Sequence, residues 1–212
     1  MRTISSINLT LTTWCSMACP DCCCDIPNKP RSEKNHVSWE YLETAAVHLR
    51  GIERINLTGG EPSLHPQFQD FVPRLKDLFG CRLLTIETNG YGFKRFPETY
   101  RSFDSIYCSH YTDKSFDGCP DNTDKIAFIK DYFSGAGPEF IVGEIDFVPR
   151  SRRGTKPCHR AFGTAVAYAN GRLYPCCVGP GLPVPHGIAL TANWRSEILA
   201  ASMPCNGCFF AD

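Results

Sequence analysis

Between residue 4 and about residue 148, short segments that alternate polar and apolar residues take turns with amphipathic helical segments. A period of two is typical of strands, and apolar residues at i, i+3, i+4 and i+7 are typical of helices. The alternation predicts repeated strand–helix units around a largely parallel sheet, which is an α/β fold. The expected strands span residues 7–12, 54–58, 83–88, 105–109 and 140–147.

Three helices fit between these strands. The first follows Ser38, a plausible N-cap, and should stop at Gly51. The second spans residues 68–79 and contains Pro73, which should kink it. The third is expected over residues 123–133.

The expected strands each have one apolar and one polar face. Parallel strands that are buried on both faces usually read as continuous apolar runs, so this division is informative. If the apolar faces pack on the helices, the polar faces line a shared concavity, and we expect an open, curved half-barrel that holds a polar ligand. The alternative is a sheet with one solvated face. The polar faces comprise Asn8, Thr10, Thr12, Asn56, Thr58, Thr85, Glu87, Tyr107, Ser109, Glu144 and Asp146.

The chain contains 13 cysteines, a count that favours metal binding over disulfides. The number is odd, and a reducing compartment would keep the thiols free. Five cysteines lie within residues 15–24 and five more within residues 158–208. The three isolated ones, Cys81, Cys108 and Cys119, are expected to be small buried hydrophobes.

Charge and hydropathy exclude two classes of partner. Lys plus Arg and Asp plus Glu both total 22, so no net field draws the chain to nucleic acid or to anionic lipid. The first residues contain no apolar signal region, and no segment approaches the roughly 20 apolar residues of a membrane span. We therefore expect a cytoplasmic protein that binds neither nucleic acid nor membrane.

The first cysteine block contains the spacing CxxxCxxC, formed by Cys15, Cys19 and Cys22 directly after the first expected strand. Parallel α/β folds expose their functional loops at this end of a strand. Three thiolates suit three corners of an iron–sulfur cube and leave one iron open to another ligand. Zinc remains an alternative because CxxC pairs also bind it, and the spacing does not exclude Cys23 or Cys24 as ligands.

The second expected strand runs directly into Gly59, Gly60, Glu61 and Pro62. Alone, this GGEP segment could be a simple turn between strand and helix. Together with CxxxCxxC it resembles the radical S-adenosylmethionine (radical SAM) enzymes, and the TNG that ends with Gly90 is also similar. Asp21 departs from the family, which usually has an aromatic residue there.

The resemblance covers about residues 4–148 and implies a shortened partial (β/α) barrel, with a core domain over residues 1–149. It implies that the three motif cysteines bind a 4Fe-4S cluster, that SAM chelates the open iron, and that the GGE segment receives the SAM amino group. Residues implied or proposed to contact SAM or substrate are Gly59, Gly60, Glu61, Pro62, Glu87, Asn89, Ser109 and Glu144, with Asp146 as a further candidate.

The second cysteine block resembles the C-terminal auxiliary-cluster modules of these enzymes, called SPASM when long and twitch when short. Asn170-Gly171 predicts a hairpin turn within it. The resemblance implies a small cysteine-rich module over residues 150–212 with a second 4Fe-4S cluster, although four thiolates also suit structural zinc. The implied ligands are Cys158, Cys176, Cys205 and Cys208, and Cys177 is the spare.

The resemblance further implies reductive cleavage of SAM to a 5′-deoxyadenosyl radical, with the electron supplied by a reductant such as flavodoxin or ferredoxin. We predict a radical SAM oxidoreductase that oxidises a small polar metabolite in the manner of a dehydrogenase, using the auxiliary cluster as electron acceptor. One alternative is a maturase that modifies a ribosomal peptide or a partner protein. The other is a non-catalytic electron carrier or zinc-stabilised protein. The sequence assigns no catalytic acid or base.

Overall fold

The structure is a computed structural model that describes residues 4–20, 22, 24, 26–113, 115–117, 119–144, 164–167, 172–174 and 188–200. These residues contribute strands to one sheet. The strands are β1 (Ser6–Thr12), β2 (Arg54–Gly59), β3 (Leu83–Thr88), β4 (Ser105–His110), β5 (Glu139–Glu144), β6 (Thr164–Ala167), β7 (Arg172–Tyr174) and β8 (Ile188–Ala189).

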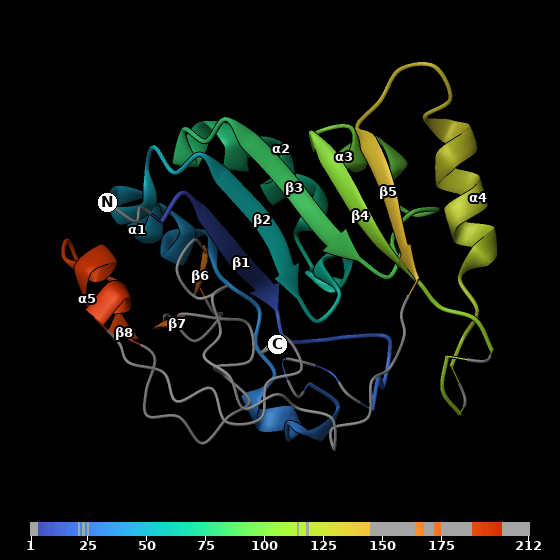
Figure 1. Cartoon of the computed structure of the whole chain (residues 1–212), viewed down its shortest axis with the longest axis horizontal. Helices are drawn as coiled ribbons and strands as arrows, with labels where there is room; N and C mark the ends of the chain where they lie inside the picture. Colours follow the sequence, from blue (N-terminus) through green and yellow to red (C-terminus); the bar gives the residue numbers. More distant parts are fainter. Residues whose placement is uncertain are drawn as a thin grey trace.

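The sheet has the order β5-β4-β3-β2-β1-β6-β7-β8 (Figure 1). Neighbouring strands from β5 to β6 are parallel, and β7 and β8 add antiparallel pairs at one edge. Four of the five predicted strands match to within one residue at either end. The fifth, β5, begins one residue early, and its predicted end at residues 145–147 lies outside the described residues.

The helices are α1 (Trp39–Leu49), α2 (Phe68–Phe79), α3 (Pro97–Tyr100), α4 (Thr123–Tyr132) and α5 (Trp194–Ala200), with 3-10 turns η1 (Ile26–Asn28), η2 (Arg31–Glu33) and η3 (Pro62–Leu64). Ser38 caps α1 as predicted, since its hydroxyl accepts a hydrogen bond from the Tyr41 N–H. Gly80 ends α2 in the left-handed conformation, with φ of 59°. Pro73 lies inside α2, and the helix continues past it to Phe79.

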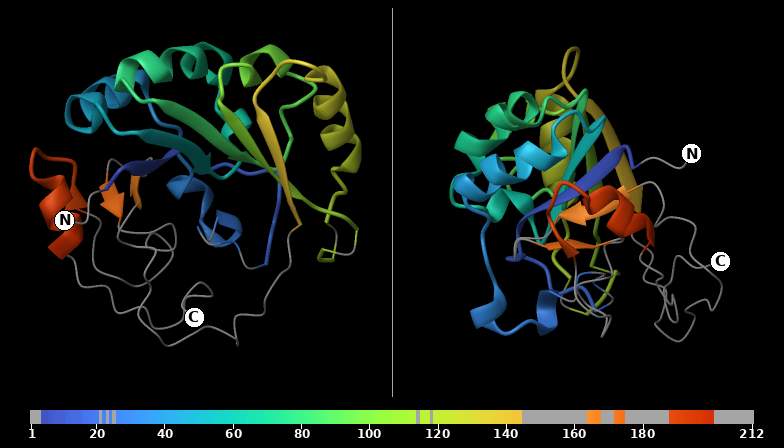
Figure 2. Two further views of the ribbon diagram at one scale, coloured as in Figure 1. Left: turned by 45° about the horizontal axis from the view of Figure 1, so that its top comes forward. Right: turned by 90° about the vertical axis from the view of Figure 1, so that its left-hand side faces the viewer.

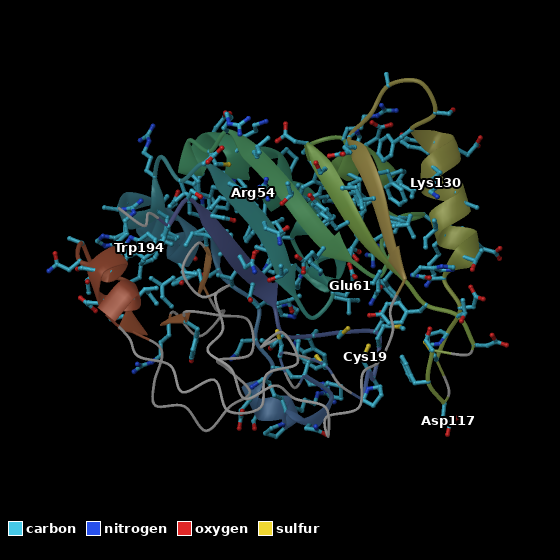
Figure 3. The ribbon with its side chains drawn as sticks, in the orientation of Figure 1. Cys19, Arg54, Glu61, Asp117, Lys130 and Trp194 are labelled. Carbon is cyan, nitrogen blue, oxygen red and sulfur yellow. The ribbon has the colours of Figure 1, made fainter. Side chains whose placement is uncertain are left out.

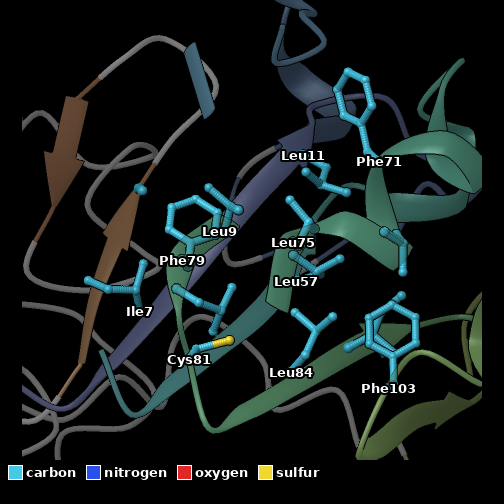
Figure 4. Close-up of a cluster of buried hydrophobic side chains, with 14 of the residues drawn as sticks. Ile7, Leu9, Leu11, Leu57, Phe71, Leu75, Phe79, Cys81, Leu84 and Phe103 are labelled. Atoms are coloured by element: carbon cyan, nitrogen blue, oxygen red, sulfur yellow. The ribbon is translucent and has the colours of Figure 1, made fainter. Parts of the chain in front are cut away.

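Helices α1 to α4 cover one side of the curved sheet, which Figure 2 shows from two further directions. The core fills the space between them. Fully or almost fully buried side chains of β1 and β2, such as Leu9 and Leu57, meet Phe71, Leu75 and Phe79 of α2 (Figure 4). Burying each such side chain contributes about 1.5–3 kcal/mol. The predicted α/β fold with an open, curved parallel sheet is confirmed.

Strand β5 turns Phe140 and Val142 toward the core, against which both pack. They are in register with Ile106 and Cys108 of β4, and Gly143 is in register with Ser109 on the polar face. The Glu144 side chain lies outside the described residues, so its place on the polar face stays a prediction.

Residues from beyond position 150 join the same sheet. Strand β6, which the sequence did not predict, pairs in parallel with β1. It also forms the predicted hairpin with β7, through Val166 opposite Tyr174, while the turn at residues 168–171 lies outside the described residues. In α5, the buried Trp194 donates its indole N–H to the His48 carbonyl of α1 at 3.1 Å. The division at residue 149 stays a prediction.

Candidate functional site

The loops that follow β1, β2, β3 and β4 meet at the carboxyl edge of the sheet, where parallel folds place their sites. Figure 3 shows Cys19 and Glu61 at this edge, with Arg54 at the other end of β2. The loop after β1 contains the three motif cysteines, and the turn after β2 contains the GGEP segment. The two predicted motifs, which follow consecutive strands in the sequence, are therefore also neighbours in space.

Cys15, Cys19 and Cys22 are partly exposed, whereas Cys24 is buried. The Cys22 N–H donates to the Cys19 carbonyl at 3.2 Å, which closes a tight turn between the two. Burial, together with the negative charges of Glu61, Cys19 and Cys22, raises the pKa of the Cys15 thiol to about 12, although the hydrogen bond from the Met17 N–H opposes the rise. Burial also raises the pKa of Cys19. Thiols in this setting need a bound cation to become thiolates.

Hydrogen-bond donors surround two of these sulfur atoms. The Met17 N–H lies 3.4 Å from the Cys15 Sγ and the Asn89 Nδ2 lies 3.8 Å from it. The Cys19 thiol donates to the Tyr111 hydroxyl at 3.6 Å, and this hydroxyl can in turn donate to a thiolate. Donors of this kind are the usual neighbours of cluster thiolates, so the donor set fits an iron–sulfur cluster. Within the described part of the chain, no three His, Cys, Asp or Glu side chains converge as ligands of a single metal ion.

The two glycines of the GGEP turn let the cysteine loop pack directly on it. The Gly60 N–H donates to the Thr12 carbonyl and the Glu61 N–H donates to the Trp14 carbonyl, both at 2.8 Å. A Cβ atom at Gly60 would collide with the Trp14 carbonyl oxygen. Gly59 has φ of 131°, a conformation that other residues rarely adopt. The glycines are therefore required by the approach of the cysteine loop.

Glu61 is fully buried and both of its carboxylate oxygens accept hydrogen bonds. Oε1 accepts from the Ser63 N–H at 3.1 Å, the Ser63 hydroxyl at 2.7 Å and the Thr88 hydroxyl at 2.8 Å. Oε2 accepts from the Asn89 N–H at 2.8 Å and from Thr88 at 2.9 Å. Burial raises the pKa of Glu61, and these hydrogen bonds oppose the rise. The carboxylate thus ties the turn after β2 to the end of β3.

Asn122 is a site residue whose role the sequence did not reveal. Its side chain is buried, and its Nδ2 donates to the carbonyls of Asn89 and Ser109, both at 2.8 Å. Its Oδ1 accepts from the Tyr111 N–H at 2.9 Å. Asn122 directly precedes α4, but its side chain makes no cap hydrogen bond there. It instead holds the ends of β3 and β4 together.

A hydrogen-bonded row crosses the polar face of β1, β2 and β3. Asn56 donates from Nδ2 to Asn8 Oδ1 at 3.1 Å and to Glu87 Oε1 at 2.8 Å, and its Oδ1 accepts from Thr85 at 2.8 Å. Glu87 is exposed, yet the surrounding protein removes part of the water from its carboxyl group, and this desolvation raises its pKa. The hydrogen bond from Asn56 opposes the rise. No ion pair among the described residues involves Glu87. The predicted polar face is thus an ordered surface with a carboxylate at its centre.

Other predicted residues fall into two groups. Pro62 begins η3 and is buried, and Cys81, Cys108 and Cys119 are buried as predicted. The second group lies outside the described residues: the Glu144 side chain, Asp146, and the implied auxiliary ligands Cys158, Cys176, Cys205 and Cys208.

Residues 9–112 match the sequence model of the Radical SAM superfamily. Molybdenum cofactor biosynthesis protein 1 of Bos taurus is 33% identical over 94 residues, which is 43% of this chain and 15% of that protein. GTP 3′,8-cyclase of Campylobacter jejuni (strain RM1221) is 31% identical over 103 residues, 48% of this chain and 32% of the relative. The matched segments thus span less than a third of either relative.

Two solved structures share the fold at low identity. BtrN in complex with AdoMet and 2-DOIA superposes with a TM-score of 0.69 and 16% identity, over 93% of this chain and 82% of BtrN. SuiB of Streptococcus suis bound to S-adenosylmethionine gives a TM-score of 0.56 and 13% identity, over 82% of this chain and 60% of SuiB. SuiB has also been solved with its precursor peptide SuiA, at a TM-score of 0.51.

No described helix is long and apolar enough to span a bilayer.

Proposed function

We propose that this chain, whose residues 9–112 form a Radical SAM superfamily domain, is a radical SAM enzyme that oxidises a small polar metabolite. The observation that carries the proposal is the packing of the cysteine loop on the GGEP turn beside the polar face. Cys15, Cys19 and Cys22 would hold a 4Fe-4S cluster, which with SAM supplies a 5′-deoxyadenosyl radical when both are bound.

The chain's own residues have separate tasks in this scheme. The backbone from Gly59 to Pro62, with the side chain of Asn89, would bind the amino-acid end of SAM. Glu61 would contribute by fixing the backbone of the turn and not by contacting SAM with its carboxylate, because both carboxylate oxygens already accept hydrogen bonds from protein donors. Ser109, at the end of β4, would contact the ribose side of SAM. The cofactor is therefore held by groups from three neighbouring loops.

The polar face supports a small polar substrate. Asn56 fixes Oε1 of Glu87, and Oε2 accepts no hydrogen bond from the described residues. A carboxylate with spare acceptor capacity can receive a hydroxyl or ammonium group of a substrate. BtrN, which shares the fold over 93% of this chain, was solved with 2-DOIA in place, and this favours a metabolite. The substrate itself would be oriented by Glu87 with its reacting hydrogen toward the carboxyl edge.

A maturase is the second candidate. SuiB, which was solved with its precursor peptide SuiA, shares the fold over 92% of this chain in that structure. The sequence relatives add a third chemistry, cyclisation of a nucleotide, but they match the part of the chain that holds the cofactor motifs. Oxidation therefore rests on the polar face and on the second cysteine block.

Cys158, Cys176, Cys205 and Cys208 would hold an auxiliary cluster, which would supply an acceptor for the electron that the substrate radical gives up. A flavodoxin or ferredoxin of the cytoplasm would supply the electron that reduces the cluster on Cys15, Cys19 and Cys22. The full reaction then removes two electrons and two protons from the substrate.

Anaerobic reconstitution tests the proposal. We expect about eight irons per chain for two clusters, and formation of 5′-deoxyadenosine when SAM and dithionite are added. Substrates deuterated at carbon would then identify the abstracted hydrogen, because the label moves into 5′-deoxyadenosine. Label transfer from amino polyols supports the metabolite, and transfer only from a peptide supports the maturase. Bound zinc without SAM cleavage would rule out both.

A further inference from the structure

Tyr111 is held in place by the residues around it. It follows β4 directly, and its side chain is only 9% exposed. Its N–H donates to Asn122 Oδ1 at 2.9 Å, and its carbonyl accepts from the Asn122 N–H at 3.1 Å. Its ring meets Phe116 edge to face at 6.4 Å. The position of the phenol is therefore fixed by the backbone as well as by packing.

The phenol oxygen of Tyr111 faces a motif cysteine. It lies 3.6 Å from the Cys19 Sγ, a normal length for a hydrogen bond to sulfur. A free thiol can donate to the phenol, but a thiolate bound to iron has no proton to give. With iron bound, the Tyr111 O–H must be the donor and the Cys19 sulfur the acceptor.

We infer that Tyr111 is a positioning residue that donates a hydrogen bond to the Cys19 thiolate and favours the reduced state of the cluster. The inference rests on the proposed function, because Cys19 must be an iron ligand. Reduction adds negative charge that the thiolates share, so a donor at sulfur stabilises the reduced state more than the oxidised one.

The midpoint potential of the reconstituted protein tests this inference. Tyr111→Phe removes the hydroxyl and keeps the ring. We expect the equilibrium constant for one-electron reduction to fall about tenfold, which corresponds to a midpoint about 59 mV more negative. Tyr91→Phe is the matched control, since Tyr91 is 44% exposed. The midpoint potential of the cluster in this variant should equal that in the wild type. Titration followed by electron paramagnetic resonance measures all three proteins.

Two further results separate the inference from the proposed function. Iron content is measured first, so that a variant that fails to bind the cluster is not mistaken for a shift. An unchanged potential in an iron-replete Tyr111→Phe protein overturns the inference and leaves the proposed function intact. A wild-type protein with no SAM cleavage overturns the proposed function itself.

Discussion

Glu61 and Glu87 are carboxylates from neighbouring strands with opposite surroundings. Glu61 is fully buried and accepts hydrogen bonds on both oxygens. Glu87 is exposed and accepts one hydrogen bond, from Asn56, among the described residues. A buried carboxylate with a full set of donors is part of the architecture, whereas one with spare acceptor capacity can bind a ligand. The two acids of the site thus serve structure and substrate separately.

The largest expected effect is the loss of stability on substituting Glu61. Glu61→Ala leaves the donors of Ser63, Thr88 and Asn89 without an acceptor in a buried place. We expect the free energy of unfolding to fall by about 3 kcal/mol. Anaerobic urea denaturation measures it, with Glu87→Ala as the control at less than about 1 kcal/mol. Equal losses in the two variants would remove the distinction between the two acids.

The next effect concerns the turn that Glu61 fixes. Gly60→Ala places a methyl group against the Trp14 carbonyl and should push the cysteine loop away. The strain is expected to cost about 1–3 kcal/mol and to release most of the bound iron. Gly143→Ala in β5 is the control, because a Cβ atom there has no neighbour within 4 Å. Full iron content in the Gly60→Ala protein would show that the close approach is not needed.

Glu87→Gln tests the other side of the comparison. The amide keeps the shape of the side chain and removes its charge, so we expect kcat/KM for the substrate to fall about tenfold, mainly through KM. The free energy of unfolding should change by less than about 1 kcal/mol, and SAM cleavage without substrate should stay unchanged. Steady-state kinetics measure the effect on the substrate that donates its label. If KM matched that of the wild type, Glu87 would not be a substrate contact.

The smallest effect is a pH dependence of stability at Glu87. Partial desolvation by the surrounding protein raises the folded-state pKa of this acid above its ordinary value of 4.5, and the hydrogen bond from Asn56 opposes the rise only in part. The folded state therefore holds the proton more tightly than the unfolded state. Wild-type stability relative to Glu87→Gln should therefore fall as pH rises from 4.5 through the folded-state pKa. The change stays below about 1 kcal/mol because solvent screens the exposed carboxylate. Urea denaturation at several pH values measures it, and an opposite slope would mean a lowered pKa.

Local periodicity predicted the elements well. Ser38 and Gly51 bound α1 as expected, Gly80 follows the expected end of α2, and the alternation of residues predicted β1 to β4 to within one residue. These features depend on neighbours in sequence, and caps and alternation report them directly. The motif cysteines and GGEP were likewise found from spacing, and the structure brings their loops together.

What the sequence missed depends on contacts between distant residues. Asn122 contacts the ends of β3 and β4, which lie 33 and 13 positions away, and an Asn at the start of a helix usually suggests a cap instead. Tyr111 contacts Cys19 across 92 positions. The four-residue β6 carries too short a pattern to identify a strand that pairs with β1.

Formation of 5′-deoxyadenosine by the iron-replete protein tests the central claim most directly. We expect the wild type to cleave SAM. We expect the same of Cys24→Ala, because the Cys24 thiol is buried beside the motif and is not a proposed ligand. We expect Cys22→Ala to lose both the SAM-binding cluster and the cleavage. A Cys22→Ala protein that still cleaves SAM, while Cys24→Ala does not, would contradict the assignment of the site.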